Sequence, residues 1–136
     1  MITLATLHEY SAQQVFDYIS NHLLTQGEKC QEIDDIGDGP SCKYRNSDKQ
    51  SCAAGCLIGP MEYTMDFEGK DWGTHVNDGR VPDVHHGLIS SMQKVHDTCN
   101  ADNWYEGLLD VARIYGFSTF KLDQYARENN YCIFDK

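Results

Sequence analysis

Cysteines and histidines carry the most specific chemistry in this sequence of 136 residues. Cys42, Cys52 and Cys56 follow one another at intervals of ten and four residues, so they could bind zinc with one histidine as the fourth ligand. The candidate histidines are His96, His75, His85 and His86. Structural zinc sites usually contain two closely spaced cysteine pairs, and this segment has a single CxxxC. The small residues at positions 53–55 favour a tightly packed junction instead. The sequence therefore predicts no cofactor and keeps zinc at these residues as the less favoured alternative.

A nucleophilic cysteine is the second chemistry that these residue types allow. Cys56 follows Gly55, and His96 or His75 could act as its base. The alternative function is therefore a small metal- or thiol-dependent hydrolase that uses Cys52, Cys56 and a histidine. The sequence has no P-loop, no dinucleotide-binding motif and no HExxH motif, so it assigns no catalytic residue. Whether the protein is an enzyme is left open, and a protein without catalytic activity is favoured.

Aromatic residues near a cation form a third candidate site. Tyr44, Arg45, Tyr63 and Trp72 lie in or just after the cysteine segment. Exposed rings could stack on a nucleobase while the Arg45 guanidinium holds a phosphate. The competing interpretation is that the rings complete a small core. We predict these four residues as the ligand-binding residues.

Carboxylates around Tyr63 offer a fourth chemistry. Glu62, Asp66 and Glu68 could bind a divalent cation or act as acid and base. Carboxylates at such spacings more often line a solvated face, and that interpretation is favoured here.

Overall composition restricts the classes of partner. The chain carries 11 Lys and Arg against 21 Asp and Glu, a formal net charge of −10. This charge opposes binding to a nucleic-acid backbone and favours basic partners, although its simplest role is to keep a small protein dissolved. No stretch approaches the ~20 apolar residues that span a bilayer, and the first residues do not resemble a signal peptide. We therefore expect no membrane association, a cytoplasmic location and reduced thiols.

The element that is best defined by its sequence is a helix at residues 11–26. Ser11 and Gln14 form a capping box, and Gly27 can end the helix in a left-handed conformation. Apolar residues recur between them with helical spacing and should be buried. They are Ala12, Val15, Phe16, Ile19 and Leu23.

Shorter elements are expected around this helix. We expect a surface loop at the acidic residues 28–41. The two strands of a hairpin are expected at 42–45 and 50–53, and an irregular connection at 66–82. Three further segments have helical patterns, and a terminal strand is expected at 131–134. The helices are expected from Asp83 to His96, from the cap pair Asn103 and Glu106 to Tyr115, and from Ser118 to Glu128 with Phe120, Leu122, Tyr125 and Ala126 inward.

These elements predict an α+β fold, in which three to four helices pack on a short β-hairpin or small antiparallel sheet. We expect one domain over residues 1–136, since domains cluster near ~100–150 residues. The cysteine segment would lie where the hairpin meets the helices.

The cysteine segment also resembles a family of small uncharacterised proteins of tailed phages and prophages. The shared pattern is C-x-Y-R, a turn, C-A-x-G-C-L-I, a Tyr and an E-G, which here is residues 42–45, Cys52 to Ile58, Tyr63 and residues 68–69. The likeness covers residues 2–115. This chain departs from it in the acidic loop at 30–41, in the turn at 46–49 and in a variable C-terminal tail at 117–136.

The resemblance implies a context and no mechanism. Small early phage proteins commonly act by binding host factors, so we expect an accessory protein in the host cytoplasm that counteracts antiviral defence. Its partner would be a host defence protein or a small nucleotide signal, and self-association is left open. Acidic charge favours the protein partner, whereas the rings beside Arg45 favour the nucleotide.

Overall fold

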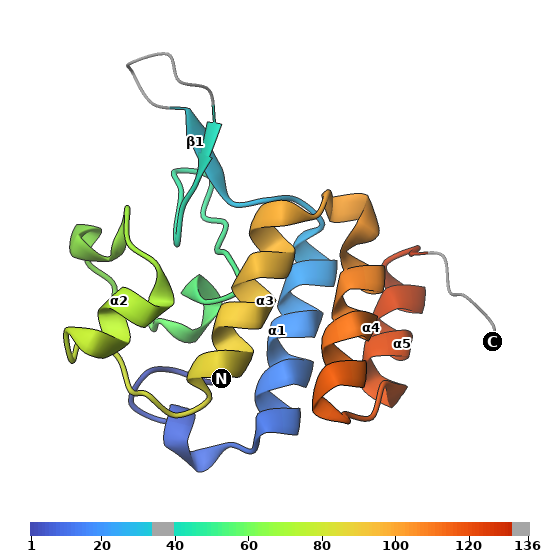
Figure 1. Cartoon of the computed structure of the whole chain (residues 1–136). Helices are drawn as coiled ribbons and strands as arrows, with labels where there is room; N and C mark the ends of the chain where they lie inside the picture. The colour runs from blue at the N-terminus through green and yellow to red at the C-terminus, as the bar shows by residue number, and fades with distance from the viewer. Residues whose placement is uncertain (34–39, 132–136) are drawn as a thin grey trace.

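The computed structural model describes residues 1–33 and 40–131. Helix α1 is the central element, and three other helices contact it along its length (Figure 1). A two-stranded antiparallel sheet projects beyond one end of these helices, which confirms the predicted α+β class. The central helix and its neighbours are α1 (Ala12–Gln26), α3 (His86–Thr98), α4 (Trp104–Tyr115) and α5 (Phe120–Glu128).

Helix α1 begins and ends where its sequence predicts. The Ser11 hydroxyl accepts a hydrogen bond from the Gln14 backbone N–H, and the Gln14 side chain accepts one from the Ser11 N–H. Gly27 ends the helix in the left-handed region, with φ of 67°. Ala12 is only half-buried. The other four predicted core residues are fully buried: Val15, Phe16, Ile19 and Leu23.

Helix α5 is confirmed, but one of its predicted inward residues is wrong. Leu122 and Ala126 are buried and Tyr125 is half-buried, whereas the side chain of Phe120 is 76% exposed. Residues two positions apart on a helix point in nearly opposite directions. Because Leu122 faces the core, Phe120 must face away from it.

Two boundaries in the middle of the chain differ from prediction. A short helix, α2 (Trp72–Asn77), lies within the segment expected to be irregular, and Asp71 caps it by accepting the Thr74 N–H. Helix α3 begins at His86 and not at an Asp83 cap, because His85 before it takes the left-handed conformation with φ of 61°.

The acidic segment at 28–41 is not entirely a loop. It contributes β1 (Gln31–Ile33) and β2 (Pro40–Cys42), which pair with Gln31 opposite Cys42. The hairpin expected at 42–45 and 50–53 is reduced to one bridge between Arg45 and Ser51. Three-residue strands are too short to show an alternating pattern, so the sequence could not locate them.

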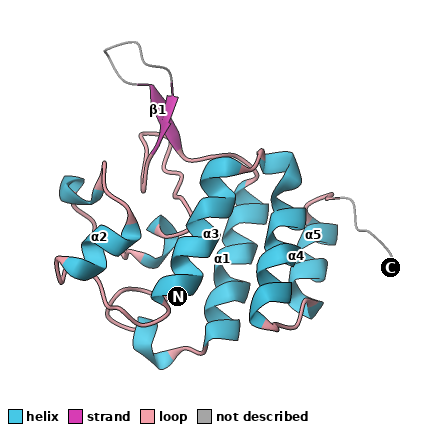
Figure 2. Ribbon diagram, viewed as in Figure 1, coloured by secondary structure: helices cyan, strands magenta, loops and turns pink. Residues whose placement is uncertain are grey.

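The chain between β2 and α2 contains only short turns of 3₁₀ helix (Figure 2). It nevertheless lies in the core, where Cys52, Ala53 and Ala54 are buried. Gly55 approaches the backbone so closely that a Cβ there would overlap the Tyr44 carbonyl oxygen. This confirms that the small residues beside the cysteines permit one backbone to pack on another.

Some expectations fall outside the described residues. The terminal strand expected at 131–134 lies almost wholly beyond Tyr131, and residues 34–39 of the expected acidic loop are also outside the described ranges. Among the helices that the structure does describe, none has both the length and the apolar composition to cross a bilayer.

Replacing Ser11 with alanine should lower the free energy of unfolding by about 1 kcal/mol, because the Gln14 N–H loses its partner. Urea denaturation would measure the change. Thr64→Ala is the matched control, since Thr64 precedes a 3₁₀ turn without making a side-chain cap hydrogen bond. Equal losses in the two variants would contradict the role of the capping box.

Candidate functional site

Three of the four predicted ligand-binding residues meet at the carboxylate of Glu68. One oxygen of Glu68 accepts the Tyr44 backbone N–H at 3.0 Å. Its other oxygen accepts the Arg45 backbone N–H at 3.2 Å and the Tyr63 hydroxyl at 2.6 Å. Glu68 therefore supplies hydrogen-bond acceptors to two backbone N–H groups of the cysteine segment. Because its carboxylate oxygens are engaged in these bonds, it is not available as a free acid or base.

The polar atoms of this cluster are directed at the protein itself. The Arg45 guanidinium donates to the Ile58 carbonyl at 2.6 Å and lies over the Tyr63 ring, 5.5 Å from its centroid. The Tyr44 hydroxyl donates to the Lys70 carbonyl at 2.7 Å, and the residue is 6% exposed. One guanidinium nitrogen of Arg45 and the Tyr44 hydroxyl are thus occupied by the protein itself, whereas the buried Arg45 Nε has no hydrogen-bond partner among the described residues.

Trp72 is not part of any exposed ring surface. It is the first residue of α2 and is 1% exposed, so its ring cannot stack on a ligand. Its place in the candidate site is therefore corrected to a place in the core. The Tyr44 ring is likewise held internally, by edge contacts with Phe67 and His75.

A pocket of about 220 Å³ lies beside this cluster. Its charged lining combines Lys43 and Lys70 with Glu68, Asp71 and Asp97, so negative groups outnumber positive ones. Such a lining does not favour the phosphates of a nucleotide. Cys42, Tyr44, Cys52 and Gln93 also line it.

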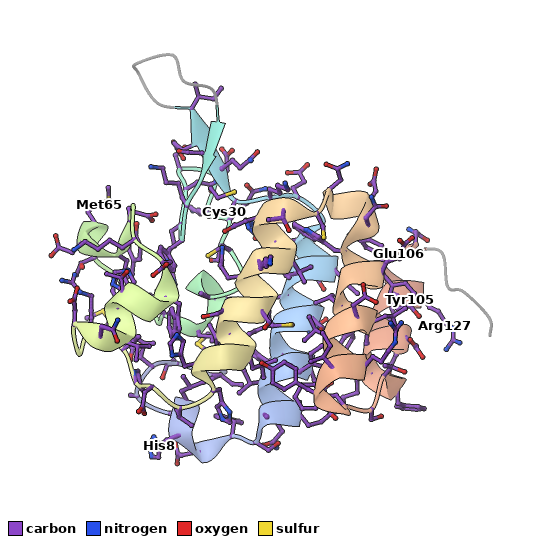
Figure 3. All side chains as sticks on the ribbon, viewed as in Figure 1. His8, Cys30, Met65, Tyr105, Glu106 and Arg127 are labelled. Carbon is purple, nitrogen blue, oxygen red and sulfur yellow. The ribbon has the colours of Figure 1, made fainter. Side chains whose placement is uncertain are left out.

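Among the described residues, Cys42, His96 and Asp97 form one group whose ligand atoms lie within 4.8 Å of one another. The ring of His96, however, already links two elements. Its Nε2 accepts the Cys30 backbone N–H at 3.0 Å, at the base of the hairpin near the end of α3 (Figure 3). Its Nδ1 must then carry the proton, which it donates to Asp97 at 2.8 Å. A metal ion at Nδ1 would leave Nε2–H facing another N–H, so this arrangement disfavours zinc at His96.

Cys52 and Cys56, the thiols that a hydrolase would use, are also engaged within the protein. Burial raises the pKa of both Cys52 and Cys56, which keeps them protonated and poorly nucleophilic. The Cys56 thiol donates to the Ala53 carbonyl at 3.1 Å. Of the two candidate bases, His96 is bonded at both nitrogens and His75 donates to the Phe67 carbonyl. The geometry thus gives catalysis by these thiols no support.

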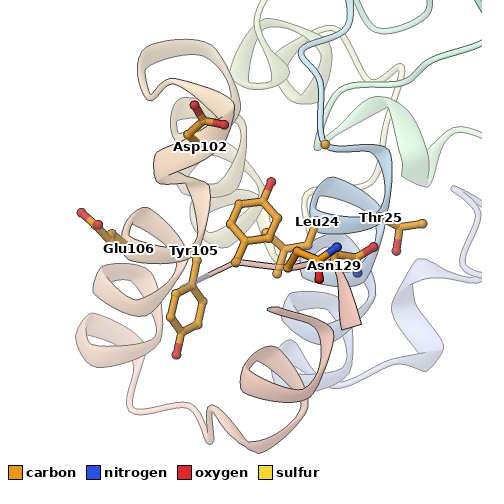
Figure 4. Close-up of a pocket in the computed structure, with 9 residues that line it drawn as sticks. Leu24, Thr25, Asp102, Tyr105, Glu106 and Asn129 are labelled. Atoms are coloured by element: carbon orange, nitrogen blue, oxygen red, sulfur yellow. The ribbon is translucent and has the colours of Figure 1, made fainter. Parts of the chain in front are cut away.

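A larger pocket, of about 490 Å³, lies elsewhere and was not anticipated (Figure 4). It is formed where α1 ends, α4 begins and α5 ends, three places far apart in the sequence. We call it the acidic pocket, because its charged residues are Asp102 and Glu106 and its lining contains no Lys, Arg or His. The other lining residues are Leu24, Thr25, Gly27, Tyr105, Asn129, Asn130 and Tyr131.

Both carboxylates of the acidic pocket are available to a partner. Asp102 and Glu106 are exposed, and no ion pair involves either of them within the described part of the chain. Burial, and then the negative charge of Asp102, raise the pKa of Tyr131, whose hydroxyl donates to the Ala101 carbonyl. The sequence suggested that Glu106 would pair with an Asn103 cap, but Asn103 makes no side-chain cap hydrogen bond. No local pattern in the sequence identifies this site, because its lining comes from three segments that only the folded chain brings together.

Scans of the chain against models of protein families, and searches of curated proteins and of solved structures, found no match. The resemblance to phage proteins therefore stays an expectation from the sequence motif.

Replacing Glu68 with alanine should lower the free energy of unfolding by at least about 2 kcal/mol, because two backbone donors and the Tyr63 hydroxyl lose their acceptor. Asp66→Ala is the matched control and should change stability by less than ~0.5 kcal/mol, since the Asp66 side chain is 79% exposed. Chemical denaturation of both variants measures the difference. A loss at Glu68 no larger than at Asp66 would show that the carboxylate does not hold this segment.

Reducing agent should leave the melting temperature nearly unchanged, because the five described cysteines are all free thiols. Thermal unfolding with and without dithiothreitol tests this directly. A fall of many degrees under reductant would mean that a disulfide stabilises the fold.

Proposed function

We propose that this protein acts by binding, and that it counteracts host antiviral defence by occupying a basic surface of a host protein. The acidic pocket supports the choice of partner, because it combines a sizeable cavity with two exposed carboxylates that form no ion pair with any other described residue. The formal net charge of −10 would speed encounter with a basic surface. The antiviral context comes from the resemblance to phage proteins alone.

The other two candidate functions have less support. Sequestration of a nucleotide signal relied on Arg45 and on exposed rings, but Arg45 is bonded to Ile58 and Trp72 is buried. A thiol-dependent hydrolase relied on Cys52 and Cys56, whose raised pKa values oppose a nucleophilic role. Binding of a basic protein surface requires neither group.

The proposal can be tested in cells that carry individual antiviral defence systems and express the protein during infection. Wild type should raise the plating efficiency of a sensitive phage, and Asp102→Asn with Glu106→Gln should lower that protection at least about tenfold, equivalent to ~1.4 kcal/mol of binding. The control is Glu9→Gln with Asp83→Asn, which removes the same charge from exposed sites outside the pocket.

The control pair should protect as well as wild type. Full protection by the pocket variant would remove the acidic pocket from the mechanism. Absence of protection by wild type against every system in a broad panel would contradict the antiviral role itself.

A further inference from the structure

The acidic pocket draws negative potential from backbone as well as side chains. Helix α1 ends at this pocket, with Leu24, Thr25 and Gly27 in its lining. The last carbonyls of a helix lack partners within the helix and carry its negative pole. A basic residue in the last turn commonly offsets that pole, and α1 has none there. Asp102, in the 3₁₀ turn at Ala101–Asn103, and Glu106, in the first turn of α4, add two full charges.

Apolar and aromatic surface completes the pocket. Leu24 and Tyr105 are almost fully buried, whereas Tyr131 is half-buried, so of these three residues Tyr131 is the one that leaves ring surface for apolar contact without adding charge. The Asn129 side-chain nitrogen donates to the Tyr125 carbonyl, which leaves its oxygen as an acceptor. This lining suits a cation on an aliphatic stem, since the stem packs on apolar groups while the head meets oxygens and a ring.

We propose that the acidic pocket binds the side chain of an arginine or lysine that the partner protein inserts. The inference deepens the proposed function, on which it rests, by naming the group that is recognised. The volume of about 490 Å³ lies within the ~300–1,000 Å³ of typical ligand pockets, and so exceeds the needs of a bare metal ion.

The test uses N-acetyl-arginine methylamide and N-acetyl-lysine methylamide as probes of the whole protein. The citrulline analogue has the shape of the arginine probe without its charge, and spermidine represents a free polyamine. Titrations followed by ¹H–¹⁵N NMR should shift the amide signals of Gly27, Asn129 and Asn130. Single residues bind weakly, so dissociation constants of about 1 mM are expected, rising with salt.

The expected order of affinity identifies the ligand. The arginine or lysine probe should bind at least about tenfold more tightly than the citrulline analogue, as expected when a charged head meets two carboxylates. Asp102→Asn with Glu106→Gln should abolish that preference, and Glu9→Gln with Asp83→Asn should keep it. Equal binding of the citrulline analogue, signal changes elsewhere, or spermidine binding alone would overturn the inference.

The two proposals can fail separately. If the arginine probe binds as described but the pocket variant still protects phage fully, the cation site stands and the proposed function is wrong. If the pocket variant loses protection but no probe binds near Gly27, the carboxylates contact a partner without receiving its side chain, and the inference is wrong.

Discussion

The need to satisfy buried backbone groups governs the segment between strand β2 and helix α2. Residues 43–71 enter the core with almost no regular secondary structure, and a buried N–H without a partner costs ~1–3 kcal/mol. Side chains supply the missing partners. Gln26 pairs with both the N–H and the carbonyl of Ser51, as a neighbouring strand would. Gln93 accepts the Ala54 N–H from α3, and Glu68 accepts from two successive residues.

This constraint explains why the sequence contains so many residues of the types that catalyse reactions or bind ligands. A histidine, an arginine or a glutamate that completes a backbone hydrogen bond has the same residue type as one that binds a ligand. His96 holds the entry to the hairpin through the Cys30 N–H, and Arg45 holds the Ile58 carbonyl. Spacing along the chain cannot distinguish these roles, because it does not show which backbone groups lack a partner. Only the three-dimensional arrangement shows that the internal bonds occupy these groups.

The sequence predicted the fold correctly where one element is long enough to contain both its end signals and an apolar stripe. Helix α1 has a capping box, an apolar stripe and a glycine end, so its limits followed from the sequence. Elements of three to six residues are too short for an apolar stripe, even where one end has a cap, as α2 does at Asp71. Strands β1 and β2 are too short to show a clear alternation of apolar and polar residues, and helix α2 is shorter than about two helical turns. Tertiary contacts therefore decide the conformation of these three elements. The prediction for Phe120 was wrong for a different reason, since Phe120 and Leu122 lie two positions apart on a helix and cannot both face the core.

The acidic pocket could not be predicted because no single segment contains it. Its walls come from the ends of α1, α4 and α5, which only the packing of the helices brings together. Within the pocket, Glu106 is stabilised by the positive pole at the start of α4, whereas the negative pole of α1 opposes both carboxylates. Like charges of this kind raise the free energy of the unliganded fold slightly, and one lysine in the last turn of α1 would remove the effect. Local rules of stability are broken most often where a protein binds something, and an incoming cation would satisfy both the helix pole and the carboxylates.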